Sequence, residues 1–161
     1  MRRLLPLLSL LVVAFAACSP SSGAGPSSGP GATRQPPPRS VAEPDILEAV
    51  FRYQFEHNAS AIRQNAEKYC LALAGGERLD AEFLRRFAGN QPLVVAADQC
   101  DRRSGRNLFF QAKIETWESD REAVVRGGYY EGNLSSSRET YRVVWEDGRW
   151  VVRDPRMEVI S

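Results

Sequence analysis

Hydrophobic residues alternate with polar ones along most of the C-terminal half of the chain. In "NLFFQAKIETW", residues 107–117, apolar residues at every second position predict a strand with one buried and one solvent-facing side. The runs "LVVAAD" at 93–98 and "EAVVRGGYY" at 122–130 predict two more strands. Gly127-Gly128 within the last of these runs indicates a bulge or bend.

A β-hairpin is predicted close to the C-terminus. Asp147-Gly148 separates two β-rich runs, and this dipeptide is typical of a type I′ turn because both turn positions need a positive φ. The two-residue turn fixes the register, so that Trp145 lies opposite Trp150. We expect this pair on the inner face of a sheet beneath a helix, with a ligand-binding aromatic patch as the alternative. The residues expected to share this face are Tyr141, Val143, Trp145, Trp150 and Val152.

Two segments have apolar residues at helical spacing. The first, "EPDILEAVFRYQFEHN", is expected to carry Pro44 in its first turn, with Glu43 and Asp45 at the positive end of the helix dipole. The second, "LDAEFLRRFAGN", is expected to have Asp80 as its N-cap and to stop at Gly89. The residues expected to face the core are Leu47, Val50, Phe51 and Phe55 in the first helix, and Phe83, Leu84 and Phe87 in the second.

The remaining apolar run, "EKYCLALAG", fits either a strand or a helix, and we favour a strand because Gly75-Gly76 closes it. The element order then predicts an α+β domain at 41–161, with a curved antiparallel sheet of four to six strands and two helices packed on one face. This order is similar to the NTF2-like (nuclear-transport-factor-2-like) and cystatin-like folds.

Several motifs carry a closer resemblance. The segments "EAVFRYQF", "FLRRF", "GGYYEGNLSSSRETYRVVWEDGRWVV" and "MEVIS" resemble a family of uncharacterised bacterial proteins that are often secreted or lipid-anchored. The resemblance covers most of residues 44–161. Because that family has no established activity, the resemblance implies a type of domain and no catalytic residues. The wider folds include both enzymes and binding modules, so the fold does not decide the function.

The N-terminus has the pattern of a bacterial export signal. Two arginines precede an apolar run that ends at Ala17 and is too short for a stable membrane span. The following "FAAC" resembles a lipobox, with Phe15 where leucine is usual. The alternative is the A-x-A site "AFA", whose cleavage would release a soluble protein with a free Cys18. We favour the lipobox, which predicts a signal peptide at 1–17 and acylation of Cys18, for example by palmitate.

Residues 18–40 separate this cysteine from the predicted domain. They are almost entirely Ser, Gly, Pro and Ala, a composition that cannot bury enough apolar surface to fold. We therefore expect a disordered tether that holds the domain at a cell membrane or outer membrane, facing the periplasm or the exterior.

Composition and charge restrict the chemistry of the domain. The net charge of +1 provides no general attraction for nucleic acids. The single histidine, His57, falls at the expected end of the first helix, where a capping role explains it. We expect no metal site and no cofactor, because no metal-ligand or cofactor motif is present. Glu115 and Glu131 are candidate acids or bases, although solvated surface carboxylates explain them as well. The segments "RLDAEFLRR" and "DRRSGR" bring together a candidate anion-binding set, Arg85, Arg86, Arg102, Arg103 and Arg106, for which a solvated face is the alternative.

Lipidation of Cys18 leaves Cys70 and Cys100 as a pair in an exported domain, where disulfides are favoured. Both lie near the ends of predicted strands. A bridge between them would contribute on the order of 3 kcal/mol by restricting the unfolded chain. Two buried free thiols are the alternative.

Three functions are compatible with these features. The first is a non-enzymatic, lipid-anchored envelope domain that binds a protein, a peptide or a small ligand. The second is a pocket-type enzyme of the NTF2-like kind, and the third is a module that forms homodimers through its sheet. The scarcity of histidine and of metal ligands favours the first or the third.

The first prediction concerns attachment to the membrane. The mature protein should begin at Cys18 and carry a diacylglycerol group, because the cysteine follows an apolar run and small residues and precedes a tether. Stable anchoring needs more than one acyl chain. Mass spectrometry of the protein from its own membranes checks this, and an unmodified N-terminus at Ala17 or Cys18 would contradict it.

Overall fold

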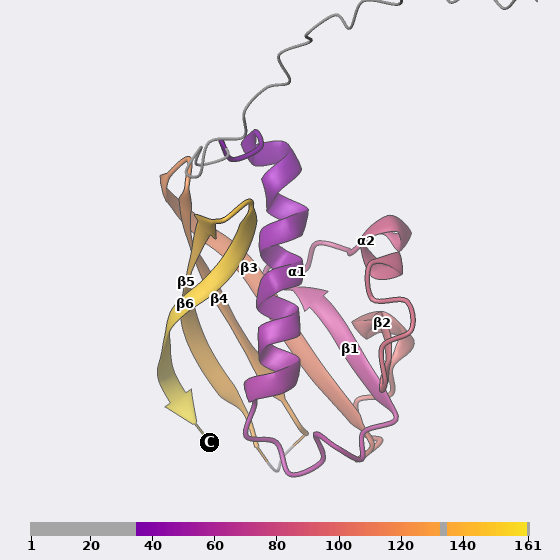
Figure 1. Ribbon diagram of the computed structural model, residues 1–161. Helices are drawn as coiled ribbons and strands as arrows, with labels where there is room; N and C mark the ends of the chain where they lie inside the picture. Colours follow the sequence, from indigo (N-terminus) through magenta and orange to yellow (C-terminus); the bar gives the residue numbers. More distant parts are fainter. Residues whose placement is uncertain (1–34, 133–134, 161) are drawn as a thin grey trace, which may run out of the picture. The chain divides into compact units, whose positions relative to one another are not determined.

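The computed structural model describes residues 35–132 and 135–160, which form a sheet with two α-helices (Figure 1). No helix in these two ranges is long and apolar enough to span a membrane. The elements in chain order are α1 (Arg39–His57), β1 (Lys68–Leu73), α2 (Ala81–Arg85), β2 (Leu93–Ala96), the 3-10 helix η1 (Ala97–Gln99), β3 (Asn107–Ser119), β4 (Glu122–Tyr130), β5 (Ser137–Glu146) and β6 (Arg149–Ile160).

The six strands lie in the order β2-β1-β3-β4-β5-β6. Strands β3 to β6 form an antiparallel meander, whereas β1 pairs in parallel with both β2 and β3. The α+β class is confirmed, but the expectation of a purely antiparallel sheet is wrong, since the sheet is mixed. The reason is the connection through α2, which returns the chain to the same end of the sheet and therefore makes β2 parallel to β1.

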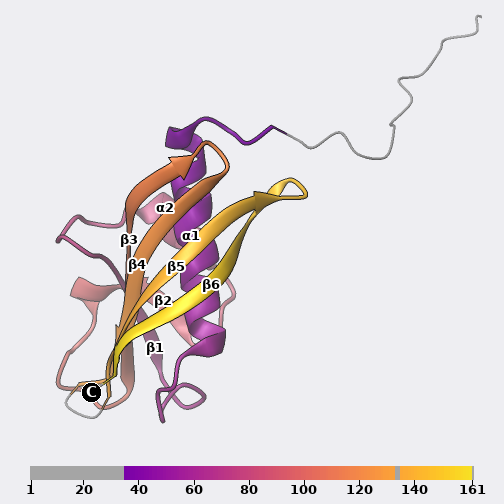
Figure 2. The same ribbon diagram turned by 90° about the vertical axis from the view of Figure 1, so that its left-hand side faces the viewer.

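Helix α1 lies across one face of the sheet (Figures 1 and 2). It begins at Arg39, so the prediction that Pro44 occupies its first turn is wrong, as is the placement of acidic residues there. The apolar stripe starts one turn earlier than expected, because Ala42 and Ile46 are also fully buried. Of the four residues expected to face the core, Leu47 is only half-buried.

Aromatic side chains fill the space between the two helices and the sheet. Phe51 of α1 meets Phe83 edge-on, with ring centroids 6.1 Å apart. The Phe55 ring packs against Phe110 of β3, with ring centroids 5.0 Å apart, and against Phe87, with ring centroids 5.7 Å apart. Helix α2 therefore packs on the same face as α1. The predicted N-cap of α2 is confirmed, since the Asp80 carboxylate accepts a hydrogen bond from the Phe83 amide.

The hairpin has the predicted turn and register. Asp147 and Gly148 have φ values of 51° and 82°, as a type I′ turn requires. Trp145 pairs with Trp150, and their rings meet edge-on at 5.5 Å. Trp150 is only 6% exposed and belongs to the core beneath α1, so the aromatic patch is the inner face of the sheet.

Gly127 and Gly128 do not form the predicted bulge, because both pair in regular register with β3. The irregularities of this strand pair lie farther along, beyond Ile114. Both glycines instead permit close approach. A Cβ atom on Gly127 would overlap the Gln54 amide nitrogen of α1, and one on Gly128 would overlap the Ser137 carbonyl oxygen of β5. Gly128 also has a φ of 154°.

Substitution of Gly128 by alanine should therefore lower the free energy of unfolding by about 2–3 kcal/mol, as overpacking against a fixed main chain does. Denaturant unfolding of the full-length protein in detergent measures this change. Gly105→Ala is the matched control, because a Cβ there meets no atom within 4 Å. Equal stability of the two variants would contradict the close approach.

Candidate functional site

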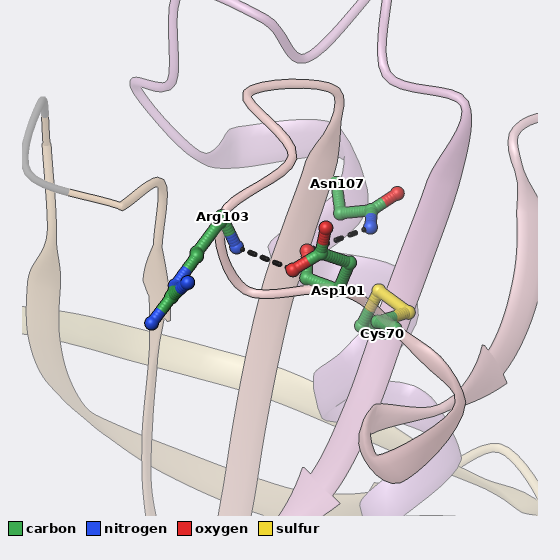
Figure 3. Close-up of a disulfide and its surroundings, with 5 residues drawn as sticks. Cys70, Asp101, Arg103 and Asn107 are labelled. Atoms are coloured by element: carbon green, nitrogen blue, oxygen red, sulfur yellow. Dashed lines mark hydrogen bonds between the residues drawn. A yellow bond between two sulfur atoms is a disulfide. The ribbon is translucent and has the colours of Figure 1, made fainter.

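A disulfide joins the first strand of the sheet to the segment that follows β2. Cys70 and Cys100, the pair proposed from the sequence, are bonded, with their Cα atoms 6.3 Å apart (Figure 3). Cys70 is fully buried in β1, where it lies beside Val95 of β2 and Phe109 of β3. Its neighbours in β1, Tyr69 and Leu71, face the helices, so the disulfide lies on the opposite face of the sheet.

The loop from Cys100 to Asn107 is held by hydrogen bonds around Asp101. The Asp101 carboxylate accepts a hydrogen bond from the Arg103 amide at 2.9 Å, and its main-chain carbonyl accepts one from the Asn107 side chain at 3.0 Å (Figure 3). Asn107 is itself buried at the start of β3. The loop is therefore fixed at one end by the disulfide and at the other by the sheet, while the Arg103 side chain extends away from Asp101.

Arg102 has an unusual environment in this loop. Its guanidinium lies 5.6 Å from the ring centroid of Phe109, a cation–π arrangement. Within residues 35–132 and 135–160, neither Arg102 nor Arg103 forms an ion pair with a carboxylate. A guanidinium without a carboxylate partner keeps its planar set of donors available for an anion.

Two adjoining hollows share Arg102 and Tyr130. We call the first the aromatic hollow; it has a volume of about 260 Å³, and its lining includes Ala72, Arg102, Phe109, Gln111, Gly128 and Tyr130. We call the second the arginine hollow; it has a volume of about 490 Å³, and its lining includes Arg102, Arg103, Asn107, Tyr130, Glu131 and Gly132. Together they offer a cation, an aromatic wall and buried polar groups, which are the usual elements of a small-molecule site.

The structure separates the five arginines that the sequence grouped together. Arg86 bonds to Asp45 and Glu48 of α1, and these bonds raise its pKa. Arg106 pairs with Glu67 at 2.6 Å. Arg85 is exposed on α2 and lines neither hollow. These three arginines are solvated or ion-paired. Arg102 and Arg103 are also exposed, and both line the arginine hollow.

The two glutamates proposed as acids or bases have different environments. Glu115 pairs with Arg126 at 3.2 Å and is exposed. Glu131 is only 4% exposed, and its Oε2 accepts a hydrogen bond from the Ser60 hydroxyl at 2.6 Å. Its Oε1 is buried and has no hydrogen-bond partner in the part of the chain that the structure describes. Glu131 is thus the candidate carboxylate that the structure places in the lining of a hollow.

His57 ends α1, as the sequence indicates. Its ring stacks on Tyr53 with centroids 4.1 Å apart, and its Nδ1 lies 2.9 Å from the Tyr53 carbonyl oxygen. This position is that of a helix-terminal residue. Among the described residues, no group of His, Cys, Asp and Glu side chains has the arrangement of a metal site.

Sequence reasoning missed a polar network between α1 and β5. Tyr141 donates a hydrogen bond to Glu139 at 2.9 Å, and Ser137 donates one to the other oxygen of the same carboxylate at 2.8 Å. Burial, together with the charge of Glu139, raises the pKa of Tyr141 well above its usual range. The Gln54 amide donates to the Gln111 carbonyl in the same region. Because Tyr141 is fully buried and bonded, the network stabilises the helix–sheet contact.

No protein-family model matches this chain, and neither a curated protein nor a solved structure shows significant similarity to it. The resemblance to a bacterial family therefore stays a hypothesis. The lipobox and Cys18 lie outside the described residues, so the lipidation site also stays a prediction.

Replacement of both Cys70 and Cys100 by alanine should lower the free energy of unfolding by about 3 kcal/mol, because the disulfide restricts the unfolded chain. Denaturant unfolding of the full-length protein without reductant measures this loss. Wild-type protein unfolded in reductant is the control and should show a similar loss. Thiol labelling of unfolded, unreduced protein should leave both cysteines unmodified, and labelling at both positions would contradict the disulfide.

Proposed function

We propose that this chain is a lipid-anchored cell-envelope protein whose domain binds, without catalysis, a small ligand that carries a carboxylate and an apolar group. The observation that carries the proposal is the Arg102 guanidinium, which is stacked on Phe109, has no carboxylate partner among the described residues and lines two adjoining hollows. The export signal, Cys18 and the tether support the envelope location. A relationship to the NTF2-like or cystatin-like folds and to the bacterial family belongs to the same proposal.

The chemistry of the two hollows selects this class of ligand. The guanidinium fork of Arg102 matches the two oxygens of a carboxylate, and its stacking on Phe109 restricts the orientations it can adopt. The ring centroids of Phe109 and Tyr130 lie 6.4 Å apart, and the two rings offer apolar surface beside the Arg102 guanidinium. Gly128 and Gln111 belong to the same lining. A ligand with a flat apolar group next to its carboxylate would contact all of these elements.

Two of the other hollows contain arginines that already have carboxylate partners. A groove of about 430 Å³ between α1 and α2 is lined by Arg86, which already pairs with Asp45 and Glu48. The hollow of about 340 Å³ beside the tryptophan hairpin is lined by Arg52, which pairs with Glu48, and by Arg149, which forms no ion pair with a described residue. Arginines that already have carboxylate partners are weaker anion sites, which favours the hollows around Arg102.

The alternatives named from the sequence have less support. The tyrosine whose pKa burial raises most, Tyr141, is bonded within the core and lines neither hollow, so it does not favour an enzyme. The solvent-facing side of β4 to β6 carries ion pairs, including Arg142 with Glu122 and Arg153 with Glu146. A sheet face covered by charged pairs is expected to face water and not a second copy of the chain.

The test is a titration of full-length protein in detergent with 3-phenylpropanoate, which combines a carboxylate with a phenyl ring. A ligand of this size should bind in roughly the millimolar range, which ligand-observed NMR measures. Arg102→Ala should weaken binding at least about tenfold, because the paired guanidinium is lost. Arg102→Lys should give an intermediate affinity, since lysine keeps the charge without the fork.

Arg85→Ala is the matched control, since Arg85 is an exposed arginine that lines neither hollow. It should bind 3-phenylpropanoate as the wild type does. Equal affinities for the wild type and Arg102→Ala would contradict the proposed site.

A further inference from the structure

The arginine hollow presents two guanidinium groups at its surface, whereas the one acidic residue among its described lining residues is buried. Arg102 and Arg103 are exposed, while Glu131 is 4% exposed and bonds to Ser60. Neither arginine forms an ion pair with a carboxylate in residues 35–132 and 135–160. A ligand with a single carboxylate would therefore match one of these two charges and leave the other without a partner.

The acidic residue next to the two arginines in the sequence does not supply the second charge. The Asp101 carboxylate accepts a hydrogen bond from the main-chain amide of Arg103 at 2.9 Å, and the Arg103 side chain extends away from it (Figure 3). Asp101 thus holds the main chain of the loop and does not pair with the Arg103 guanidinium. The planar set of donors on this guanidinium is available to an anion from outside.

The loop that carries both arginines is restrained along its length. The disulfide attaches Cys100 to the buried Cys70. The Asp101 carbonyl accepts hydrogen bonds from the Ser104 amide at 3.2 Å and from the Asn107 side chain at 3.0 Å, and the Asn107 amide donates to the Ser104 carbonyl at 3.2 Å. A restrained loop loses less conformational entropy when a ligand binds, so both arginines can contribute to affinity.

The two hollows place these groups in a definite order. Phe109 lines only the aromatic hollow, Arg102 lines both hollows, and Arg103 lines only the arginine hollow. Arg102 therefore stands at the junction, with an aromatic wall on one side and the second guanidinium on the other. The apolar group of a ligand suits the first side and a charged group suits the second.

We infer that the ligand of this site is a dicarboxylate, with one carboxylate bound by Arg102 at the junction and the second bound by Arg103 in the arginine hollow. The inference rests on the proposed function and specifies its ligand further. Both carboxylates lie close together at one end of the ligand, and the apolar group lies at the other end, against Phe109 and Tyr130. The hollow of about 490 Å³ that Arg103 lines receives the second carboxylate and the carbon that carries it.

Four probes test this arrangement on full-length protein in detergent near neutral pH. The first is 3-phenylpropanoate. The second, 2-benzylsuccinate, adds a carboxymethyl group on the carbon next to the first carboxylate, and the third replaces that added carboxylate by an uncharged amide. The fourth, 3-(4-carboxyphenyl)propanoate, carries its second carboxylate at the far end of the ring.

Wild-type protein should bind 2-benzylsuccinate about fivefold more tightly than each of the other three probes, which is the upper range for an exposed pair of opposite charges. Ligand-observed NMR gives the four dissociation constants. The preference should decrease as salt is added, because exposed charges are screened. The fourth probe has the same charge as 2-benzylsuccinate, so it separates recognition by the two arginines from general attraction of a dianion.

Arg103→Gln should bind 2-benzylsuccinate and 3-phenylpropanoate with similar affinity, while its affinity for 3-phenylpropanoate stays at the wild-type value. That unchanged affinity also shows that the variant is folded and that Arg102 is in place. Glutamine keeps the main-chain amide that bonds to Asp101. Arg85→Gln is the matched control, since it removes an exposed arginine outside both hollows, and it should keep the full preference for 2-benzylsuccinate.

The possible failures are distinguishable. Equal binding of 2-benzylsuccinate and 3-phenylpropanoate to wild-type protein, with both dependent on Arg102, overturns the role of Arg103 and leaves the proposed function in place. A preference for 2-benzylsuccinate that remains in Arg103→Gln, or an equal gain for 3-(4-carboxyphenyl)propanoate, also overturns the inference alone. Binding of none of the four probes overturns both proposals.

Discussion

The close approach of α1 and β5 to β4 is the constraint on which the rest of the structure depends. A side chain at Gly127 would overlap Gln54 of α1, and one at Gly128 would overlap the main chain of β5. Without side chains at these two positions, the Gln54 amide reaches the Gln111 carbonyl of β3 at 3.1 Å. Helix α1 therefore packs close to the sheet, so that Phe51 contacts Phe83 and Phe55 contacts Phe110.

The same pair of glycines connects the fold to the candidate site. Gly128 also belongs to the lining of the aromatic hollow, together with Gln111 and Tyr130. A substitution there would therefore disturb both the strand pairing and the hollow. The meander supplies the buried core, whereas the parallel edge, with the disulfide and the loop from Cys100, supplies the arginine side chains.

The sequence predicted the features that depend on local rules. The register at Asp147-Gly148 follows from the turn alone, and the N-cap at Asp80 follows from helix capping. The predictions were wrong for features that depend on contacts between residues far apart in the sequence. The parallel pairing of β1 depends on where the chain returns after α2, which no periodicity records. The glycine pair suggested a bulge because the sequence cannot show which side chain or strand lies against it.

The candidate site was only partly visible for the same reason. The arginine-rich segments were evident, but ion pairs made in the fold separate Arg86 and Arg106 from Arg102. Glu131 was one of two candidate carboxylates, and its burial and its bond to Ser60 distinguish it from Glu115.

Local charge, and not net charge, determines what this surface can bind. The chain carries a net charge of only +1, and exposed pairs such as Arg142 with Glu122 neutralise the solvent face of the meander. The hydrogen bond from Arg142 lowers the pKa of Glu122, so this pair remains charged on both sides near neutral pH. Surface pairs of this kind add little stability, but they cancel one another's field beyond a short distance. Of the charged residues that line the two hollows, Arg102 and Arg103 are exposed, whereas Glu131 is buried. The charge at the surface of these hollows is therefore that of the two arginines.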